Sequence, residues 1–170
     1  MKIRLAKERG EWAELCFMAK ATENGFKLTK PWGDSSPYDF VIDLGGRFVS
    51  VQVKSTACQW PCERRSRPGN FVIKLQRGDA RRYRQSDFDY LAVYIIPKDA
   101  WYIIPFVLVA AQITVRFCPG ARDNRYERYR EAWQLFREFP LTSAEKAALV
   151  HGRRRRKHGF GKRGKVVTRE

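Results

Sequence analysis

The sequence predicts an α/β domain in which an opening helix precedes a mixed or mostly antiparallel sheet and a closing helix, followed by a basic extension. Three observations support this fold class. Apolar residues recur at helical spacing near the N-terminus, a Gly-Gly pair separates two segments of strand character, and 44% of the 170 residues are hydrophobic. This apolar content is enough to bury a core, which argues against a globally disordered chain.

The first predicted element is a helix over residues 7–23. Its apolar side chains recur at helical spacing, at Trp12, Leu15, Cys16 and Ala19. The Asn-Gly pair at 24–25 is a typical helix stop. A short strand over residues 26–29 and a loop over residues 31–37, rich in Pro, Gly, Asp and Ser, are expected to follow.

The predicted sheet is built around a β-hairpin. Residues 38–44 and 47–55 have strand character and flank the Gly-Gly pair at 45–46, which is a strong hairpin signal. A basic loop is expected over residues 57–69. The remaining strand candidates are residues 71–75, 90–96 and 101–104, with a weaker one at 113–117.

Beyond the sheet, a second long helix is expected over residues 124–139. Its aromatic side chains step by three and four residues, and they fit a buried core face better than a base-stacking surface: Tyr126, Tyr129, Trp133 and Phe136. Thr142 and Glu145 form a capping-box pattern that opens a short last helix. The composition then changes, so we expect one folded domain over residues 1–150 and a basic, flexible tail over residues 151–170.

The net charge indicates a polyanionic partner. Lys and Arg number 34 against 18 Asp and Glu, which gives +16, and the tail contributes +8 from nine basic residues and one Glu. The other +8 belongs to the domain, which therefore stays basic without its tail, as is typical of proteins that bind nucleic acids. An anionic membrane surface is the weaker alternative, because the basic residues do not line one amphipathic helix.

Other classes are excluded by what the sequence lacks. No apolar run approaches the ~20 residues of a membrane span. Residues 1–9 contain no apolar signal core, so we expect a cytoplasmic protein whose four cysteines are reduced thiols rather than disulfides or zinc ligands. Both histidines, His151 and His158, lie in the basic tail, so the chemistry would depend on carboxylates, lysine and a metal rather than on a histidine-activated nucleophile.

The predicted hairpin brings three polar side chains together. With the glycine pair at its tip, paired positions sum to 91, so Asp39 lies opposite Gln52. Because side chains alternate along a strand, Lys54 shares the face of Gln52, while the intervening valines line the buried face. Cross-strand Cβ atoms lie about 5 Å apart, which is close enough to share one metal ion.

This trio suits metal-dependent phosphodiester chemistry. Mg²⁺ takes carboxylate, amide and backbone oxygens and water as ligands, and it activates water and polarises a phosphoryl oxygen. Lys54 would orient the attacking water and balance the charge that develops in the transition state. The alternative is an ordinary hairpin whose polar face is exposed to solvent.

Segments that contain these residues resemble the PD-(D/E)XK nuclease superfamily. They are residues 10–14 (GEWAE), 37–41 (PYDFV) and 51–54 (VQVK), together with residues 89–94 and 101–105. Within the superfamily, the chain is similar to bacterial endonucleases encoded in group I introns, which carry Tyr-Asp on one strand and Gln-Val-Lys on the next. The resemblance covers roughly residues 8–110 and implies an α/β fold with a restriction-endonuclease-like core, in which helices flank a central mixed β-sheet.

The resemblance also implies roles for four residues. Asp39 would be the central metal ligand, and Gln52 would offer its amide oxygen where most members have Asp or Glu. Lys54 would be the signature lysine. Glu14 would complete the metal site from the first helix, with Glu11 as the competing choice. We expect Mg²⁺ as the cofactor, with Mn²⁺ able to replace it, and weaker metal binding because Gln52 carries no charge.

Together these features predict a Mg²⁺-dependent endonuclease that cuts double-stranded DNA sequence-specifically in an intron-homing role. The intron-type resemblance implies a homo-oligomer, a dimer or tetramer, because cutting both strands needs two active sites. The alternatives are a nuclease of branched DNA, of the Holliday-junction resolvase type, and a catalytically silent nucleic-acid-binding module of the same fold. The arginines expected to contact DNA are Arg64, Arg65, Arg67, Arg81, Arg82, Arg84, Arg153, Arg154, Arg155 and Arg156.

Overall fold

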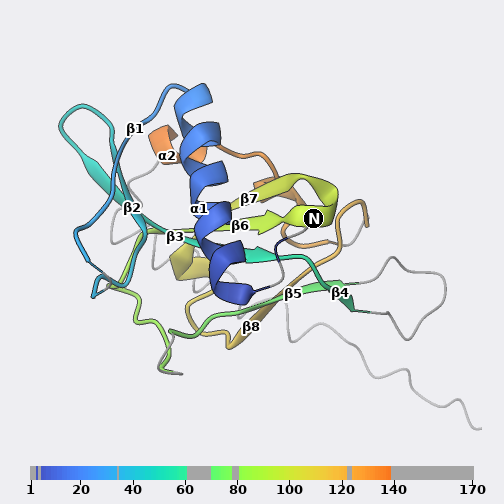
Figure 1. The fold of residues 1–170 in the computed structure, drawn as a ribbon. Coiled ribbons are helices and arrows are strands. Elements are labelled where there is room, and N and C mark those ends of the chain that lie inside the picture. The colour runs from blue at the N-terminus through green and yellow to red at the C-terminus, as the bar shows by residue number, and fades with distance from the viewer. Residues whose placement is uncertain are drawn as a thin grey trace, which may run out of the picture. The chain divides into compact units, whose positions relative to one another are not determined.

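The computed structural model describes residues 3, 5–33, 35–60, 70–77, 81–121 and 124–138. Its centre is a five-stranded mixed sheet with the strand order β1-β2-β3-β6-β7 (Figure 1). Strands β3 and β6 are parallel, and the other neighbours are antiparallel. The strand bounds are Lys27–Thr29 for β1, Phe40–Asp43 for β2, Phe48–Thr56 for β3, Tyr90–Ile95 for β6 and Ala100–Pro105 for β7.

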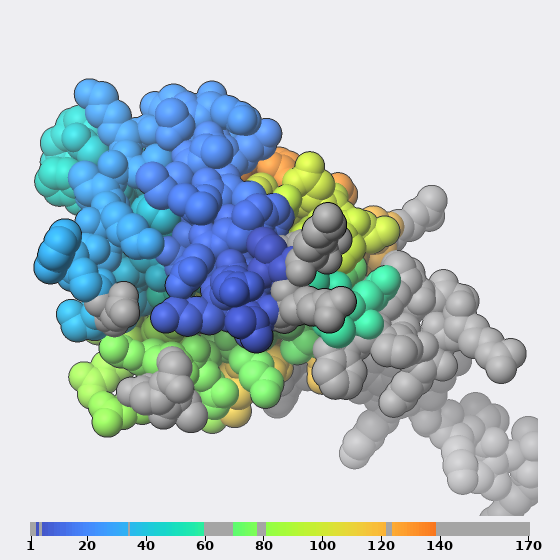
Figure 2. Space-filling model, viewed as in Figure 1, coloured from blue at the N-terminus to red at the C-terminus, as the bar shows by residue number. Residues whose placement is uncertain are grey.

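Helix α1 (Ala6–Glu23) lies across one face of this sheet and covers the centre of that face in Figure 2. Its buried residues, Ala13, Phe17 and Ala21, are spaced by four, so the small alanines let the Phe17 ring come within 5.3 Å of the Phe40 ring of β2. The predicted helix is confirmed to within one residue. Of the apolar residues that indicated this helix, Trp12 and Cys16 pack against the core, whereas Leu15 is 64% exposed.

A second, three-stranded sheet packs against the face of the main sheet that is turned away from α1. It consists of β4 (Gln59–Trp60), β5 (Asn70–Lys74) and β8 (Thr114–Phe117) in the antiparallel order β4-β5-β8. Tyr102 of β7 contacts Phe117 of β8, with ring centroids 4.8 Å apart. The predicted strands at 71–75 and 113–117 are confirmed, whereas β4 lies within the predicted loop and becomes a strand by pairing with β5.

The β2–β3 hairpin has the predicted register. Val41 lies opposite Ser50 and Asp43 lies opposite Phe48. The turn depends on glycine, since Gly45 and Gly46 have φ angles of 73° and 107°, a region that side chains disfavour.

The predicted second helix is wrong in most of its length. Residues 124–138 contain only a 3₁₀ turn, η3 (Glu127–Tyr129), and one short helix, α2 (Leu135–Glu138). Between them the backbone is captured by the edge of β7, where Arg130 pairs with Tyr102 and the Glu131 N–H donates to the Trp101 carbonyl over 2.8 Å. The aromatic positions are nevertheless all buried as predicted: Tyr126, Tyr129, Trp133 and Phe136.

Several sequence predictions lie outside the described residues. These are the short last helix, the domain boundary at residue 150 and the basic tail. Cys16, Cys58 and Cys118 are free thiols, as expected, and Cys62 is outside the described part. In the described part of the chain, no helix is both long and apolar enough to cross a membrane.

Candidate active site

Asp39 and Gln52 meet across the hairpin, immediately before β2 begins. The Asp39 N–H donates to the Val51 carbonyl over 2.9 Å, which extends the hairpin pairing by one residue. In return, Asp39 Oδ2 accepts hydrogen bonds from Gln52 Nε2 over 2.5 Å and from the Val53 N–H over 2.7 Å. Two donors from β3 therefore hold this carboxylate in one orientation.

Gln52 lies deeper in the protein than the sequence suggested. A solvent-facing polar strand was the alternative to a functional site, but Gln52 is only 6% exposed because β3 is the central strand of the sheet. Its Nε2 also donates to the Val53 carbonyl over 3.1 Å. A buried amide bonded to a carboxylate is costly to maintain unless both groups are satisfied, and here both are.

The environment of Asp39 resists a negative charge. Burial raises the pKa of Asp39 to about 6, and the nearby carboxylate of Glu14 adds to this rise. The Val53 N–H, Lys54 and Lys30 act in the opposite direction and favour the charged form. Glu14, Lys30 and Lys54 are thus close enough to act on the same carboxyl group.

Glu14 reaches this site from α1 and is paired with a lysine that sequence reasoning missed. Lys30 Nζ donates to Glu14 Oε2 over 2.7 Å and lies 5.7 Å from the centre of the Phe40 ring. Lys30 follows β1 in the loop that leads to Asp39, sixteen positions from Glu14, so no local pattern could have indicated the contact. Glu11, the competing candidate, is exposed on the helix.

Lys54 is half-buried, and its surroundings were also missed. Its Nζ lies 5.4 Å from the centre of the Tyr83 ring, and Tyr83 packs edge-on against Phe88 with ring centroids 4.9 Å apart. Tyr83 is the aromatic residue within the arginine-rich segment 81–84, and this pattern was the only sequence feature that could have indicated the contact. This contact places the Lys54 ammonium group against the face of the Tyr83 ring.

Comparisons with known proteins show the family of this chain. A model of the family described as PD-(D/E)XK endonuclease matches residues 5–136. The chain belongs to this family. The restriction-endonuclease-like fold and the suspected superfamily are therefore confirmed.

The chain is also similar to two solved structures. The bacterial homing endonuclease I-Ssp6803I is 27% identical, with a TM-score of 0.64 over 91% of this chain and 99% of that chain. The Holliday junction resolvase Hjc of the archaeon Archaeoglobus fulgidus is 14% identical, with a TM-score of 0.41 over 65% of this chain and 84% of that chain. No curated protein matches.

The donor set of this PD-(D/E)XK endonuclease suits a hard divalent cation. Asp39 and Glu14 offer carboxylate oxygens and Gln52 an amide oxygen, and a cation bound beside Asp39 would favour the charged form that burial disfavours. No cluster of three or more His, Cys, Asp or Glu residues is found among the described residues. For Gln52 to take part in binding a cation, its amide would have to present its oxygen rather than Nε2, which here donates to Asp39 Oδ2.

The predicted DNA-contacting arginines are only partly described. Arg81, Arg82 and Arg84 are exposed and flank Tyr83, the ring that contacts Lys54, so their segment borders the candidate site. The remaining arginines lie outside the described residues: Arg64, Arg65, Arg67, Arg153, Arg154, Arg155 and Arg156.

Proposed function

We propose that this protein is a metal-dependent endonuclease that hydrolyses phosphodiester bonds in double-stranded DNA, sequence-specifically and in an intron-homing role. The observation that carries the proposal is the cross-strand constellation of Asp39, Gln52 and Lys54 beside Glu14. Further support comes from the similarity to I-Ssp6803I, a bacterial homing endonuclease of which 99% is covered.

In this proposal, Asp39, Glu14 and the Gln52 amide oxygen hold Mg²⁺, or Mn²⁺ in its place. When bound, the cation supplies polarisation of the scissile phosphoryl group and activation of water. The hydrogen bond from the Val53 N–H holds the Asp39 carboxylate in one orientation, whether or not a metal ion is bound. Lys54 orients the attacking water and balances the negative charge that develops on the phosphate.

Lys30 pairs with Glu14 and offsets its charge. In the absence of a metal ion, this pairing limits the repulsion between the Glu14 and Asp39 carboxylates. The absence of a charge on Gln52 lowers the negative potential of the site, so we expect weaker metal affinity than three carboxylates would give.

The substrate follows from charge and from the number of cuts. A net charge of +16 favours a polyanion, and a double-strand cut needs two active sites, so we propose a homo-oligomer acting on DNA inside the cell. The uncharged Gln52 favours a second candidate, a catalytically silent DNA-binding module of the same fold.

The deciding experiment compares wild type with Lys54→Ala on supercoiled plasmid and on a synthetic four-way junction, with Mg²⁺, Mn²⁺ or EDTA. Lys98→Ala, which removes an exposed lysine from the 3₁₀ turn η1 (Ile96–Lys98), is the matched control. We expect metal-dependent cutting of DNA by wild type and by Lys98→Ala, but not by Lys54→Ala. Tight binding of both substrates without cutting in either metal would favour the silent module. Cutting of the junction whatever its sequence would identify a branched-DNA nuclease. An uncut plasmid alone decides neither, because a sequence-specific nuclease leaves a plasmid without its target intact.

A further inference from the structure

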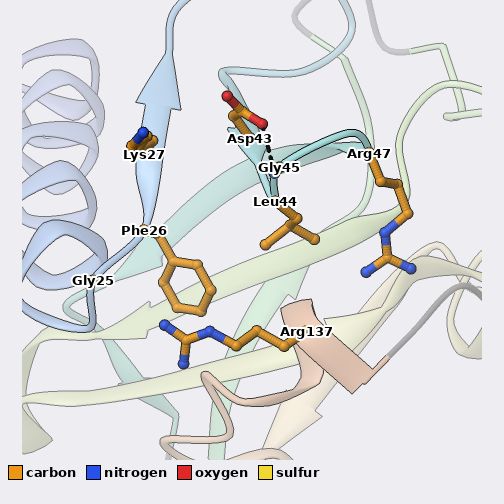
Figure 3. Close-up of a pocket in the computed structure, with 8 residues that line it drawn as sticks. All are labelled: Gly25, Phe26, Lys27, Asp43, Leu44, Gly45, Arg47 and Arg137. Carbon is orange, nitrogen blue, oxygen red and sulfur yellow. Dashed lines mark hydrogen bonds between the residues drawn. The ribbon is translucent and has the colours of Figure 1, made fainter.

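A pocket of about 560 Å³ lies at the tip of the β2–β3 hairpin (Figure 3). Three segments that are distant in sequence form it: the residues after α1, the hairpin turn and α2. The charged and aromatic residues that line it are Lys27, Arg47, Arg137, Asp43 and Phe26. The proposed catalytic residues do not line it, so the pocket has no role in the chemistry proposed above.

The pocket is electropositive. Lys27, Arg47 and Arg137 supply three positive charges against the one carboxylate of Asp43, whose Oδ1 accepts a hydrogen bond from the Gly45 N–H over 2.8 Å. Among the described residues, no salt bridge joins any of the three cations to a carboxylate. The net charge of +2 is therefore not neutralised inside the hollow, where a low-dielectric wall strengthens its field.

Neutral groups hold the two guanidinium groups in place. Arg47 Nη2 donates to the Phe136 carbonyl over 2.9 Å, and Arg137 Nη2 donates to the Asn24 carbonyl over 2.8 Å. The Arg137 guanidinium also lies 4.3 Å from the centre of the Phe26 ring. Each guanidinium carries five N–H donors, so these contacts position the group and leave donors for a ligand.

We propose that this pocket binds a phosphodiester group of the DNA backbone, away from the scissile one. Arginine forks with an adjacent ammonium suit phosphate oxygens, and the inference rests on the proposed DNA-cutting function. Asp43 ends β2, four residues after Asp39, which lies immediately before the strand; four residues span about 13 Å at ~3.3 Å per residue. That span equals about four nucleotides at ~3.4 Å per strand position, so DNA that follows the hairpin carries a phosphate to the pocket.

The test measures how the affinity for a short DNA duplex depends on salt, in EDTA, for wild type and Lys27→Gln. Lys27 is exposed and makes no side-chain hydrogen bond or ion pair with the residues that the structure describes, and thermal unfolding checks the fold. Loss of one phosphate contact should reduce the slope of log affinity against log salt by about 0.9. The control, Lys20→Gln, removes the same charge from a lysine already paired with Glu23 at 2.9 Å and should leave the slope unchanged.

The outcomes separate this inference from the proposed function. Wild type that neither binds nor cuts DNA overturns both. Wild type that binds and cuts DNA, together with an unchanged slope in Lys27→Gln, overturns the pocket alone. Calorimetry with inorganic phosphate provides a further arm: phosphate binding that is lost in Lys27→Gln while the DNA slope is retained would show a free-anion site and contradict the DNA contact.

Discussion

Replacement of Asp39 by asparagine is expected to abolish cleavage and yet stabilise the metal-free protein at neutral pH. Burial and Glu14 raise the pKa of Asp39 from 3.8 to about 6, so the folded protein bears the cost of an unfavourable charge at pH 7. At about 1.4 kcal/mol per pH unit, this difference amounts to about 3 kcal/mol in the free energy of unfolding. Solvent reaches part of the carboxyl and screens it, so we expect a gain of about 1 to 3 kcal/mol for Asp39→Asn.

The sign of the pH dependence follows from proton binding. Between pH 3.8 and about 6 the folded protein retains a proton that the unfolded chain has released, so the stability of wild type falls as the pH rises through this window. Asp39→Asn lacks this titration, and its remaining amide oxygen can still accept the Val53 N–H. The stability advantage of the variant should therefore be small near pH 4 and reach its full size above pH 6.

Urea unfolding in EDTA at several pH values measures this difference. Asp43→Asn is the matched control, because it makes the same change at the other end of β2 and keeps an acceptor for the Gly45 N–H. Saturating Mg²⁺ should reverse the order by stabilising wild type and not Asp39→Asn. The reasoning fails if the variant is less stable than wild type at pH 7 without metal, or if the difference does not change with pH.

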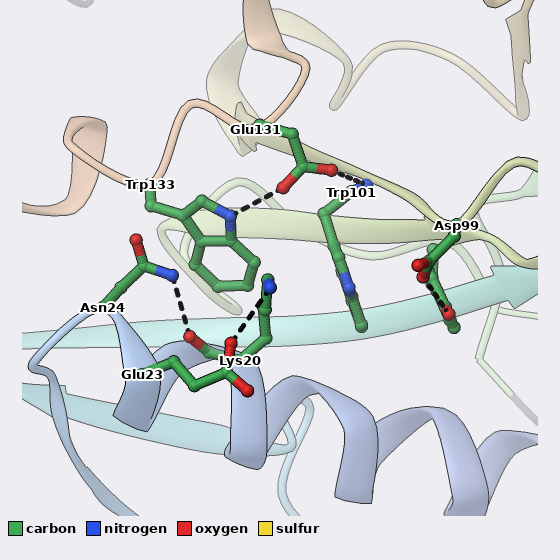
Figure 4. A network of polar contacts seen from close by, with 8 residues as sticks. Lys20, Glu23, Asn24, Asp99, Trp101, Glu131 and Trp133 are labelled. Atoms are coloured by element: carbon green, nitrogen blue, oxygen red, sulfur yellow. Dashed lines mark hydrogen bonds and ion pairs between the residues drawn. The ribbon is translucent and has the colours of Figure 1, made fainter.

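Two further predictions concern the fold. The Glu131 carboxylate accepts the Trp101 N–H over 2.7 Å and the Trp133 indole N–H over 2.9 Å (Figure 4), so Glu131→Ala should lower the free energy of unfolding by about 2 to 4 kcal/mol and Glu131→Gln by about half as much. Chemical denaturation checks this, and equal effects of the two variants would contradict the hydrogen-bond explanation. Gly45→Ala should cost about 1 kcal/mol because φ is 73° there, whereas Gly10→Ala, in α1 with open space around its Cβ position, should stabilise by about 0.5 to 1 kcal/mol. Shifts of the same sign in the melting temperatures of these two variants would refute the backbone argument.

The hairpin shows how far local sequence information reaches. A glycine pair at the turn and alternation along two strands are enough to place Asp39 opposite Gln52, because register follows from the turn once its position is known. The same local pattern could not show that Gln52 is buried. Its burial depends on β6, which pairs in parallel with β3 but comes from a distant part of the chain.

Residues 124–138 show the opposite case. Their aromatic spacing fits a helix, and the prediction that these side chains are buried is correct, yet most of the helix is absent. The edge of β7 presents backbone hydrogen-bonding groups at Trp101 and Tyr102. A short non-helical stretch at residues 130–131 bonds to these groups, whereas a helix there would leave them unpaired. A sequence pattern indicates which side chains are buried, but it does not show whether a strand edge elsewhere in the fold pairs with the backbone of that segment.

The sequence by itself determined the first helix, the hairpin and its register, and the set Asp39, Gln52 and Lys54, because each depends on residues that are close in the chain. The tertiary structure decided which helix face is buried, paired Lys30 with Glu14, set Tyr83 against Lys54 and assembled the cationic pocket of Lys27, Arg47 and Arg137. These contacts join segments that are far apart in the sequence, so they form and contribute to stability only after the sheet has brought the segments together.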